Sequence, residues 1–187
     1  MKYMTPASNS LPLLLCCSSN YIKLNGNDLI SGIPYKGKYI YIKIVNGKPY
    51  HADIILAEPC LNPVISPKLA SVIKEKKVQY GELIPIYEGF YKDYFVLNAI
   101  PLLDIVNEEK STTMCINGKN IYVNVYLNEY SGPDGVFRIR DYAVIPFVTE
   151  GMIQIIKQFD YKGIAFRDDM LVNSAKYQKY QKLMQNP

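Results

Sequence analysis

The chain has 187 residues, of which 49% are hydrophobic and 20% are charged, and its formal net charge is +4. This composition excludes a disordered chain, because disordered segments combine few apolar residues with a high net charge. The charge is mild for a nucleic-acid binder, and no zinc-finger spacing, aromatic RNA-binding signature or basic zipper is present. We therefore expect a globular protein that does not bind nucleic acid.

The first element in chain order is the apolar stretch "LPLLLCC" at residues 11–17. It is much shorter than the roughly 20 apolar residues that a membrane-spanning helix needs, and Pro12 interrupts it. Lys2 alone makes a weak basic region for a signal peptide. We interpret the stretch as a core segment and expect a cytoplasmic protein with no membrane partner, ahead of a periplasmic one.

Asn-Gly pairs mark three predicted hairpin turns, because both residues tolerate the positive φ that tight turns require. The pairs are Asn25-Gly26, Asn46-Gly47 and Asn117-Gly118. Alternating β-branched or aromatic flanks predict strands around the second and third turns, at residues 38–45, 48–55, 112–116 and 120–127. Further strands are predicted at residues 21–24, 82–88, 93–100, 136–140 and 142–148. Pro85 favours a sheet edge or a bulge for its strand.

Two stretches share one pattern: "VISPKLASVIK" at residues 64–74 and "FVTEGMIQIIK" at residues 147–157. Ser66 and Thr149 are predicted N-caps of helices near 67–77 and 150–159. Each helix follows a short apolar run and leads through a glycine, Gly81 or Gly163, into a strand. The predicted apolar faces are Leu69, Val72 and Ile73 in the first helix and Met152, Ile155, Ile156 and Phe159 in the second. We infer a structural unit that is used twice.

These elements predict an α+β fold, mostly an antiparallel sheet of hairpins with two similar strand–helix–strand units. We expect a single domain over residues 1–187. Its parts are a hairpin-rich segment at 1–62, the repeated units at 63–166 and a tail or last helix at 167–187.

Catalytic signals are sparse. His51 is the only histidine, and it lies two residues from Asp53 on a predicted strand, where both would face the same side. The chain has no GxSxG, GxGxxG, Walker or HExxH sequence. The four cysteines, Cys16, Cys17, Cys60 and Cys115, form no CxxC pair and indicate neither a disulfide framework nor a metal site. We expect no enzyme, cofactor or metal, and a small hydrolase using His51 is the minor alternative.

Six segments follow one another in a distinctive order. They are "PVISPKLASVIK" (63–74), "GELIPIY" (81–87), "DYFVLNAI" (93–100), Asp104 with Glu109-Lys110-Ser111, "VFRIR" (136–140), and the second capped helix with "KGIAF" (162–166). This order resembles a family of bacterial immunity proteins, immunity protein family eleven, which are encoded beside polymorphic toxins. Thr149 stands where the second unit usually has serine, and the first sixty residues lie outside the resemblance.

The resemblance implies an antitoxin that neutralises a cognate secreted toxin by tight, stoichiometric binding without catalysis. Such a protein needs a rigid scaffold that presents Tyr and Arg anchors. The candidate partner-binding residues are Tyr122, Tyr126, Tyr130, Arg138, Arg140 and Arg167. The mild positive charge predicts a neutral or acidic partner. A generic protein-binding scaffold is the alternative function.

Overall fold

The computed structural model describes residues 1–6, 13–17, 24, 29, 32–58, 61–98, 100–116, 119–140, 145–161, 163–167 and 170–171. The contacts divide the chain into two compact units. The first unit comprises Met1–Asp104 and Gly132–Arg167, and the second comprises Ile105–Ser131 and Asp168–Pro187. The fold is α+β with mostly antiparallel sheets, as predicted.

A four-stranded antiparallel sheet forms the centre of the first unit. Its strands are β4 (Ile54–Ala57), β5 (Asn62–Ile65), β7 (Phe95–Asn98) and β6 (Glu82–Pro85), in that spatial order. Strands β6 and β7 form the predicted hairpin. Pro85 is the last residue of β6, which is the edge strand of this sheet, in agreement with the missing donor of proline.

Two more strands close this sheet into a ring. Strand β2 (Leu13–Cys17) pairs antiparallel with β3 (Tyr41–Asn46). At one end the Ile40 N–H donates to the Pro85 carbonyl at 3.0 Å. At the other end the Cys16 N–H donates to the Glu58 carbonyl at 2.8 Å, directly after β4. The apolar stretch "LPLLLCC" therefore supplies a buried strand, with Leu14 and Cys16 inside the ring.

The central sheet is buried on both faces, which explains its continuous apolar sequence. Ile55, Val64 and Val96 pack into the core inside the ring. The residues next to them, among them Ile54 and Ile65, pack into a second core under the helices. Because neighbouring side chains of a strand point to opposite faces, all four residues of β5 are buried.

The two predicted helices begin at their predicted caps. Helix α1 (Pro67–Glu75) follows Ser66, whose hydroxyl accepts from the Leu69 N–H at 3.2 Å. Helix α2 (Glu150–Ile156) follows Thr149, whose hydroxyl accepts from the Met152 N–H at 3.3 Å. Both caps have nearly the same extended backbone, with φ −67° and ψ 159° in one and φ −74° and ψ 164° in the other. Both helices are shorter at their C-terminal ends than predicted.

A second sheet completes the first unit. Its strands are β13 (Ile164–Arg167), β1 (Lys2–Pro6), β12 (Phe147–Val148), β11 (Val136–Ile139) and β8 (Leu102–Leu103), in that spatial order. Strands β11 and β8 are parallel, and the other pairs are antiparallel. The short strand β8 is not among the predicted strands.

The repeated unit is larger in the structure than in the sequence. The order β4–β5–β7–β6 around α1 matches the order β11–β12–β1–β13 around α2. Ile84 and Val64 pair with the same residue of β7, one from each side. Arg167 and Phe147 likewise pair with the same residue of β1. Ile84 and Arg167 each lie eighteen residues after their caps, Ser66 and Thr149, so the strands that follow the two helices have the same register. Strand β1, from the start of the chain, occupies the place that β7 occupies in the other half.

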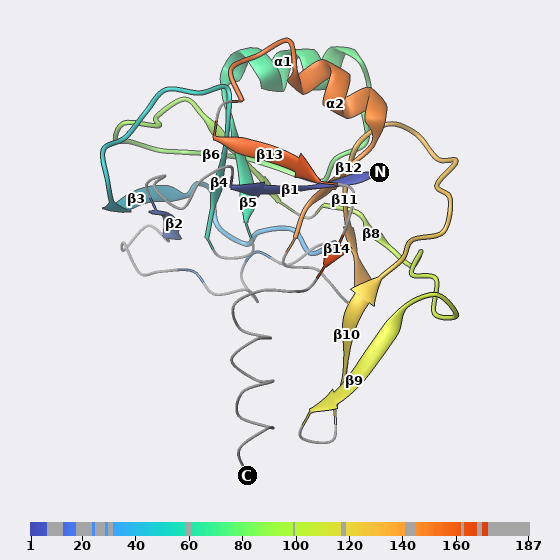
Figure 1. The fold of residues 1–187 in the computed structure, drawn as a ribbon. Helices are drawn as coiled ribbons and strands as arrows, with labels where there is room; N and C mark the ends of the chain where they lie inside the picture. The colour runs from blue at the N-terminus through green and yellow to red at the C-terminus, as the bar shows by residue number, and fades with distance from the viewer. Residues whose placement is uncertain are drawn as a thin grey trace. The chain divides into compact units, whose positions relative to one another are not determined.

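The two halves share one core beneath the helices, which lie side by side in Figure 1. Residues at matching positions of the two units contribute to it. The matching pairs are Ile54 and Val136, Ile65 and Val148, Leu69 and Met152, Ala70 and Ile153, Ile73 and Ile156, and Leu97 and Met4.

The second unit contains the third predicted hairpin. Strand β9 (Thr112–Ile116) pairs antiparallel with β10 (Lys119–Val125), and the register shifts between Tyr122 and Asn124. Strand β10 also pairs with β14 (Met170–Leu171). No helix among the described residues is long and apolar enough to cross a membrane.

The hairpin predicted at Asn46-Gly47 is wrong. Strand β3 ends there, but its antiparallel partner is β2, and no strand begins before Ile54. The intervening segment instead offers its carbonyls to tyrosine hydroxyls: Tyr91 donates to Tyr50 and Tyr94 to Ala52, each at 3.1 Å. The strand predicted at 21–24, the Asn25-Gly26 and Asn117-Gly118 turns and the tail beyond 171 lie largely or wholly outside the described residues.

Candidate binding surface

Three tyrosine rings meet on the outside of the strand ring. Tyr39 stacks on Tyr87 with ring centroids 4.6 Å apart, and Tyr41 meets both rings edge-on at 5.8 and 5.6 Å. Tyr87 remains 57% exposed. We call Tyr39, Tyr41 and Tyr87 the tyrosine cluster. A rigid, exposed aromatic group of this kind is the usual anchor of a protein interface.

The cluster follows from the alternation of β3. Ile40, Ile42 and Ile44 pack into the core inside the ring, so the residues between them face outward. Lys43 is accordingly exposed, as is Val45 at 43%. Tyr87 comes from a distant segment and is brought to β3 by its N–H, which donates to the Ile40 carbonyl at 3.0 Å.

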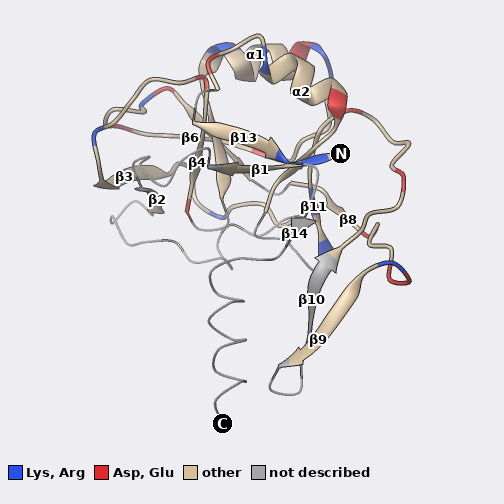
Figure 2. Cartoon of the chain, viewed as in Figure 1, with Lys and Arg blue, Asp and Glu red and all other residues tan. Residues whose placement is uncertain are grey.

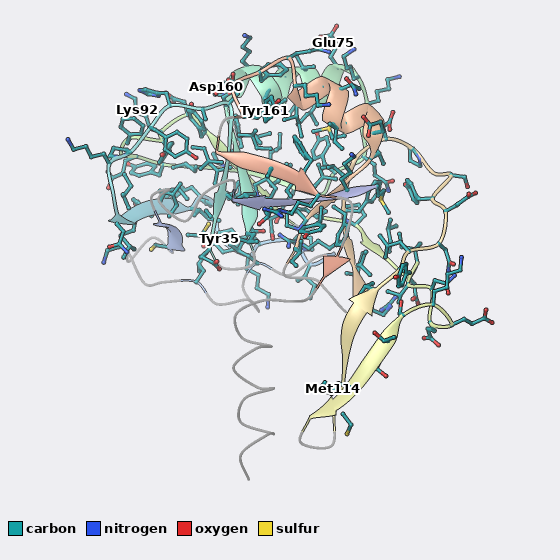
Figure 3. The ribbon with its side chains drawn as sticks, viewed as in Figure 1. Tyr35, Glu75, Lys92, Met114, Asp160 and Tyr161 are labelled. Carbon is teal, nitrogen blue, oxygen red and sulfur yellow. The ribbon has the colours of Figure 1, made fainter. Side chains whose placement is uncertain are left out.

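The turn between β6 and β7 extends this exposed aromatic surface. Phe90 is 41% exposed, and its ring lies 4.5 Å from the His51 ring. Gly89 has φ +89° and Asp93 has φ +72°, so two left-handed residues shape the turn that also carries Lys92 (Figure 3). The Tyr91 and Tyr94 hydroxyls hold this turn against the 50–52 segment.

Burial raises the pKa of four tyrosines around this surface. It raises the pKa of Tyr50 to about 12, with contributions from Tyr91 and Asp160. Burial is also the first cause of the raised pKa values of Tyr41, Tyr91 and Tyr94. These phenols therefore stay protonated at neutral pH, and those of Tyr91 and Tyr94 act as hydrogen-bond donors.

The Asp53 carboxylate accepts hydrogen bonds from two distant segments of the first unit. One oxygen of its carboxylate accepts from the Ser66 hydroxyl at 2.5 Å, and the other accepts from the Asp160 N–H at 3.1 Å. Asp160 lies between α2 and β13 (Figure 3). The His51 ring instead lies tilted against the Phe90 ring, at an interplanar angle of 31°. The strand predicted over His51 and Asp53 is absent, since β4 begins only at Ile54.

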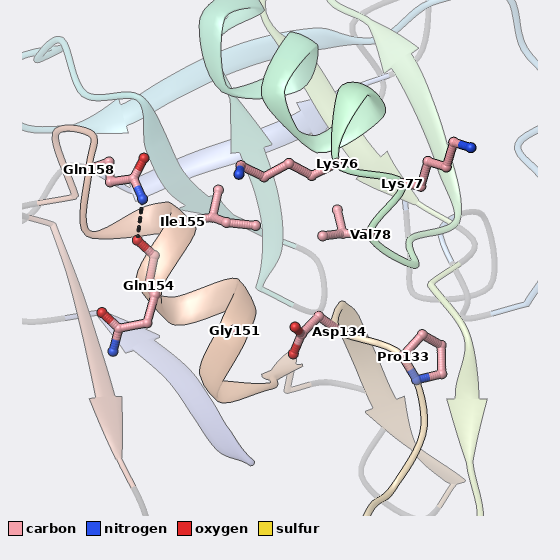
Figure 4. Close-up of a pocket in the computed structure, with 9 residues that line it drawn as sticks. All are labelled: Lys76, Lys77, Val78, Pro133, Asp134, Gly151, Gln154, Ile155 and Gln158. Atoms are coloured by element: carbon pink, nitrogen blue, oxygen red, sulfur yellow. Dashed lines mark hydrogen bonds between the residues drawn. The ribbon is translucent and has the colours of Figure 1, made fainter.

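An open pocket of about 580 Å³ lies between the end of α1, the start of α2 and the loop before β11. Gln154 and Gln158 are connected by a hydrogen bond of 3.1 Å along one wall (Figure 4). The remaining lining residues are Lys76, Lys77, Val78, Pro133, Asp134, Gly151 and Ile155. The lining thus mixes charges of both signs with amides and shows no arrangement suited to one reaction.

The six predicted contact residues do not form one described surface. The three tyrosines belong to the second unit, where Tyr126 is 54% exposed, and the three arginines belong to the first. Arg138 is only 1% exposed and donates to the Asn62 side chain at 3.0 Å, so it serves the interior. Arg140 lies at the surface, 3.5 Å from Asp104, and Arg167 is exposed at the end of β13.

Sequence reasoning missed the tyrosine cluster. The alternation of Tyr39 and Tyr41 with isoleucines was a usable signal, because it places both rings on one face. The third ring was not predictable, because its position depends on the parallel bridge between Ile40 and Ile86. Among the described residues, no group of three or more His, Cys, Asp or Glu side chains could hold a metal ion. No model of a known protein family matches the chain, and no curated protein matches it.

Proposed function

We propose that this chain is a non-catalytic, cytoplasmic immunity protein that binds and neutralises a cognate bacterial toxin. The observation that carries the proposal is the tyrosine cluster on the outside of a closed ring of strands. Tyrosine supplies a large contact area at a low cost in side-chain entropy, and a closed ring holds it in place before binding. The resemblance of residues 63–166 to immunity proteins supplies the kind of partner.

The physical requirement for neutralisation by binding is a slow dissociation rate. Affinity differences among related complexes lie mainly in that rate, and buried aromatic anchors lower it most. Tyr87 is suited to this task because its ring is exposed while its backbone is fixed to β3. The partner would bury the ring without reorganising the strand.

Co-expression with the neighbouring gene, which the proposal expects to encode the toxin, tests the proposal. Cells that make the toxin domain alone should stop growing, and the chain should restore growth and co-purify with the toxin in equal amounts. A variant with His51→Ala should rescue equally well, because binding is proposed to replace catalysis. Absence of both rescue and co-purification would refute the proposed function. Co-purification without rescue would instead favour the scaffold alternative.

A further inference from the structure

The segment that carries β3 has an unbalanced charge. Residues 32–52 contain Lys36, Lys38, Lys43 and Lys48 and no acidic residue. All four lysines are exposed, and none forms an ion pair with a residue in the described part of the chain. We call them the lysine group. Helix α1, by contrast, carries Glu75 next to Lys74, and both charge signs appear on the two helices (Figure 2).

The lysine group lies in the same stretch of chain as two members of the tyrosine cluster, Tyr39 and Tyr41. Lys38 precedes Tyr39, and Lys43 follows Tyr41 on the outward side of β3. Val45 continues this surface on the outward side of β3, with 43% exposure, and Ile33 in the same stretch of chain is 49% exposed. An apolar centre with a charged rim is the usual anatomy of a protein interface, in which the rim directs association and the centre slows dissociation.

The arrangement of the rings favours a protein partner over a nucleic acid. Single-stranded nucleic acids stack on separate aromatic platforms along a groove, usually with arginine contributions. Here the three rings contact one another, Tyr41 is 8% exposed, and residues 32–52 contain no arginine. Tyr87 is thus the one ring of the cluster that is free to enter a pocket.

We propose that the surface formed by the tyrosine cluster, on the outward face of β3, and by the lysine group, on and beside β3, is the docking surface for the toxin. The toxin presents an acidic surface around an apolar pocket that takes Tyr87. This inference rests on the proposed function and names the surface and the partner's chemistry.

The test uses three variants and the purified toxin domain that the proposed function expects the adjacent gene to encode. The first is Tyr87→Ala. The second changes the lysine group to glutamate. The third is a matched control that changes four other exposed lysines to glutamate, namely Lys68, Lys76, Lys110 and Lys157. Both quadruple variants have a net charge of −4 in place of +4, because each exchange replaces a positive charge by a negative one. Circular dichroism and urea unfolding establish that each variant is folded.

Tyr87→Ala should weaken binding about 30-fold, mainly through faster dissociation. Reversing the lysine group should slow association by about tenfold or more at low salt, and the difference should shrink as the salt concentration approaches about 1 M. The control reversal should change association less than about threefold.

Equal effects of the two quadruple variants, or unchanged binding by Tyr87→Ala, would overturn the docking surface while leaving the proposed function intact. A parent chain that neither binds nor rescues would overturn both. An oligothymidylate of about twenty nucleotides serves as a further probe. If it binds the parent more tightly than the toxin does and depends on the same lysines, the surface is a nucleic-acid site and the inference is wrong.

Discussion

At the first turn of each helix, a buried hydroxyl group has two hydrogen-bond partners. Ser66 accepts from its own helix and donates to Asp53, while Thr149 accepts from the Met152 and Gly135 N–H groups. Both side chains are nearly inaccessible, at 4% and 6% exposure. Each cap therefore connects its helix to the residue that directly precedes the pair of strands leading into that helix.

Replacing Ser66 by alanine should lower the free energy of unfolding by about 2–3 kcal/mol, because it removes the cap and leaves the Asp53 carboxylate without its hydroxyl donor. Urea unfolding measures this loss. Ser71→Ala is the matched control on the same helix, since the Ser71 hydroxyl is exposed and donates only to the Pro67 carbonyl. The control should change stability by less than about 0.5 kcal/mol. Equal losses in the two variants would contradict the capping role.

Tyr50 makes stability depend on pH in the alkaline range. Its pKa is raised from 10.0 to about 12 by burial, with contributions from Tyr91 and Asp160, so the folded state holds the phenol proton more tightly than the unfolded chain does. The stabilisation is therefore complete below pH 10 and is lost as the pH rises through 12. In Tyr50→Phe, the loss of stability over this range should be smaller than in the parent. Urea unfolding between pH 10 and 12 measures the free energy of unfolding, and Tyr126→Phe, at an exposed site, is the control. If the free energy of unfolding falls equally steeply with pH in the parent and in Tyr50→Phe, Tyr50 does not have this role.

At the scale of elements, Arg138 joins the two sheets of the first unit. It lies on β11, and its guanidinium donates to the side chain of Asn62, the first residue of β5. Both residues are 1% exposed. A buried charge of this kind is stabilising only while its hydrogen bonds are made.

Arg138→Ala should destabilise the protein by about 3–5 kcal/mol, because Asn62 loses its donor and a large buried volume is emptied. Arg140→Ala, two residues along, removes an exposed arginine and should cost less than about 1 kcal/mol. Thermal unfolding of the two variants makes the comparison. A similar melting temperature for both would show that the link between β11 and β5 contributes little.

The elements differ in how far the sequence predicts them. Both helices were predictable, because Ser66 and Thr149 are strong caps before apolar residues with helical spacing. The β6–β7 and β9–β10 hairpins were predictable from alternation and short turns. The partner of β3 was not, because the Asn46-Gly47 turn signal is local, whereas the pairing with β2 is decided by burial of Leu14 and Cys16 inside the ring. The tyrosine cluster could not be predicted for the same reason, because Tyr87 lies beside β3 only when the strands close into the ring.

For the molecule as a whole, the main finding is a duplicated unit completed by a strand from outside it. The sequence predicts the strand–helix–strand repeat, and even a proline recurs three residues before each cap, at Pro63 and Pro146. It does not predict that β1 takes the place of β7, because residues 1–6 do not resemble β7 in sequence. Only the matching registers show the correspondence.

Removing residues 1–6 should prevent the first unit from folding, because β1 lies between β12 and β13 and pairs with both. Terminal residues are usually dispensable, so this outcome is diagnostic. Met4→Ala should cost about 2–5 kcal/mol, since Met4 is fully buried in the shared core. Thr5→Ala, at a partly exposed site, is the control. Amide hydrogen exchange and urea unfolding measure both, and a folded truncated chain would contradict the assignment of β1.

The place of β1 also has a consequence during biosynthesis. Strand β1 leaves the ribosome well before its partners β12 and β13, because about 140 residues or more separate them, as the pairing of Tyr3 with Arg167 shows. The nascent chain must therefore carry an unpaired strand until the residues of β12 and β13 have been translated. Contacts so distant in sequence slow folding, and unpaired strands invite aggregation.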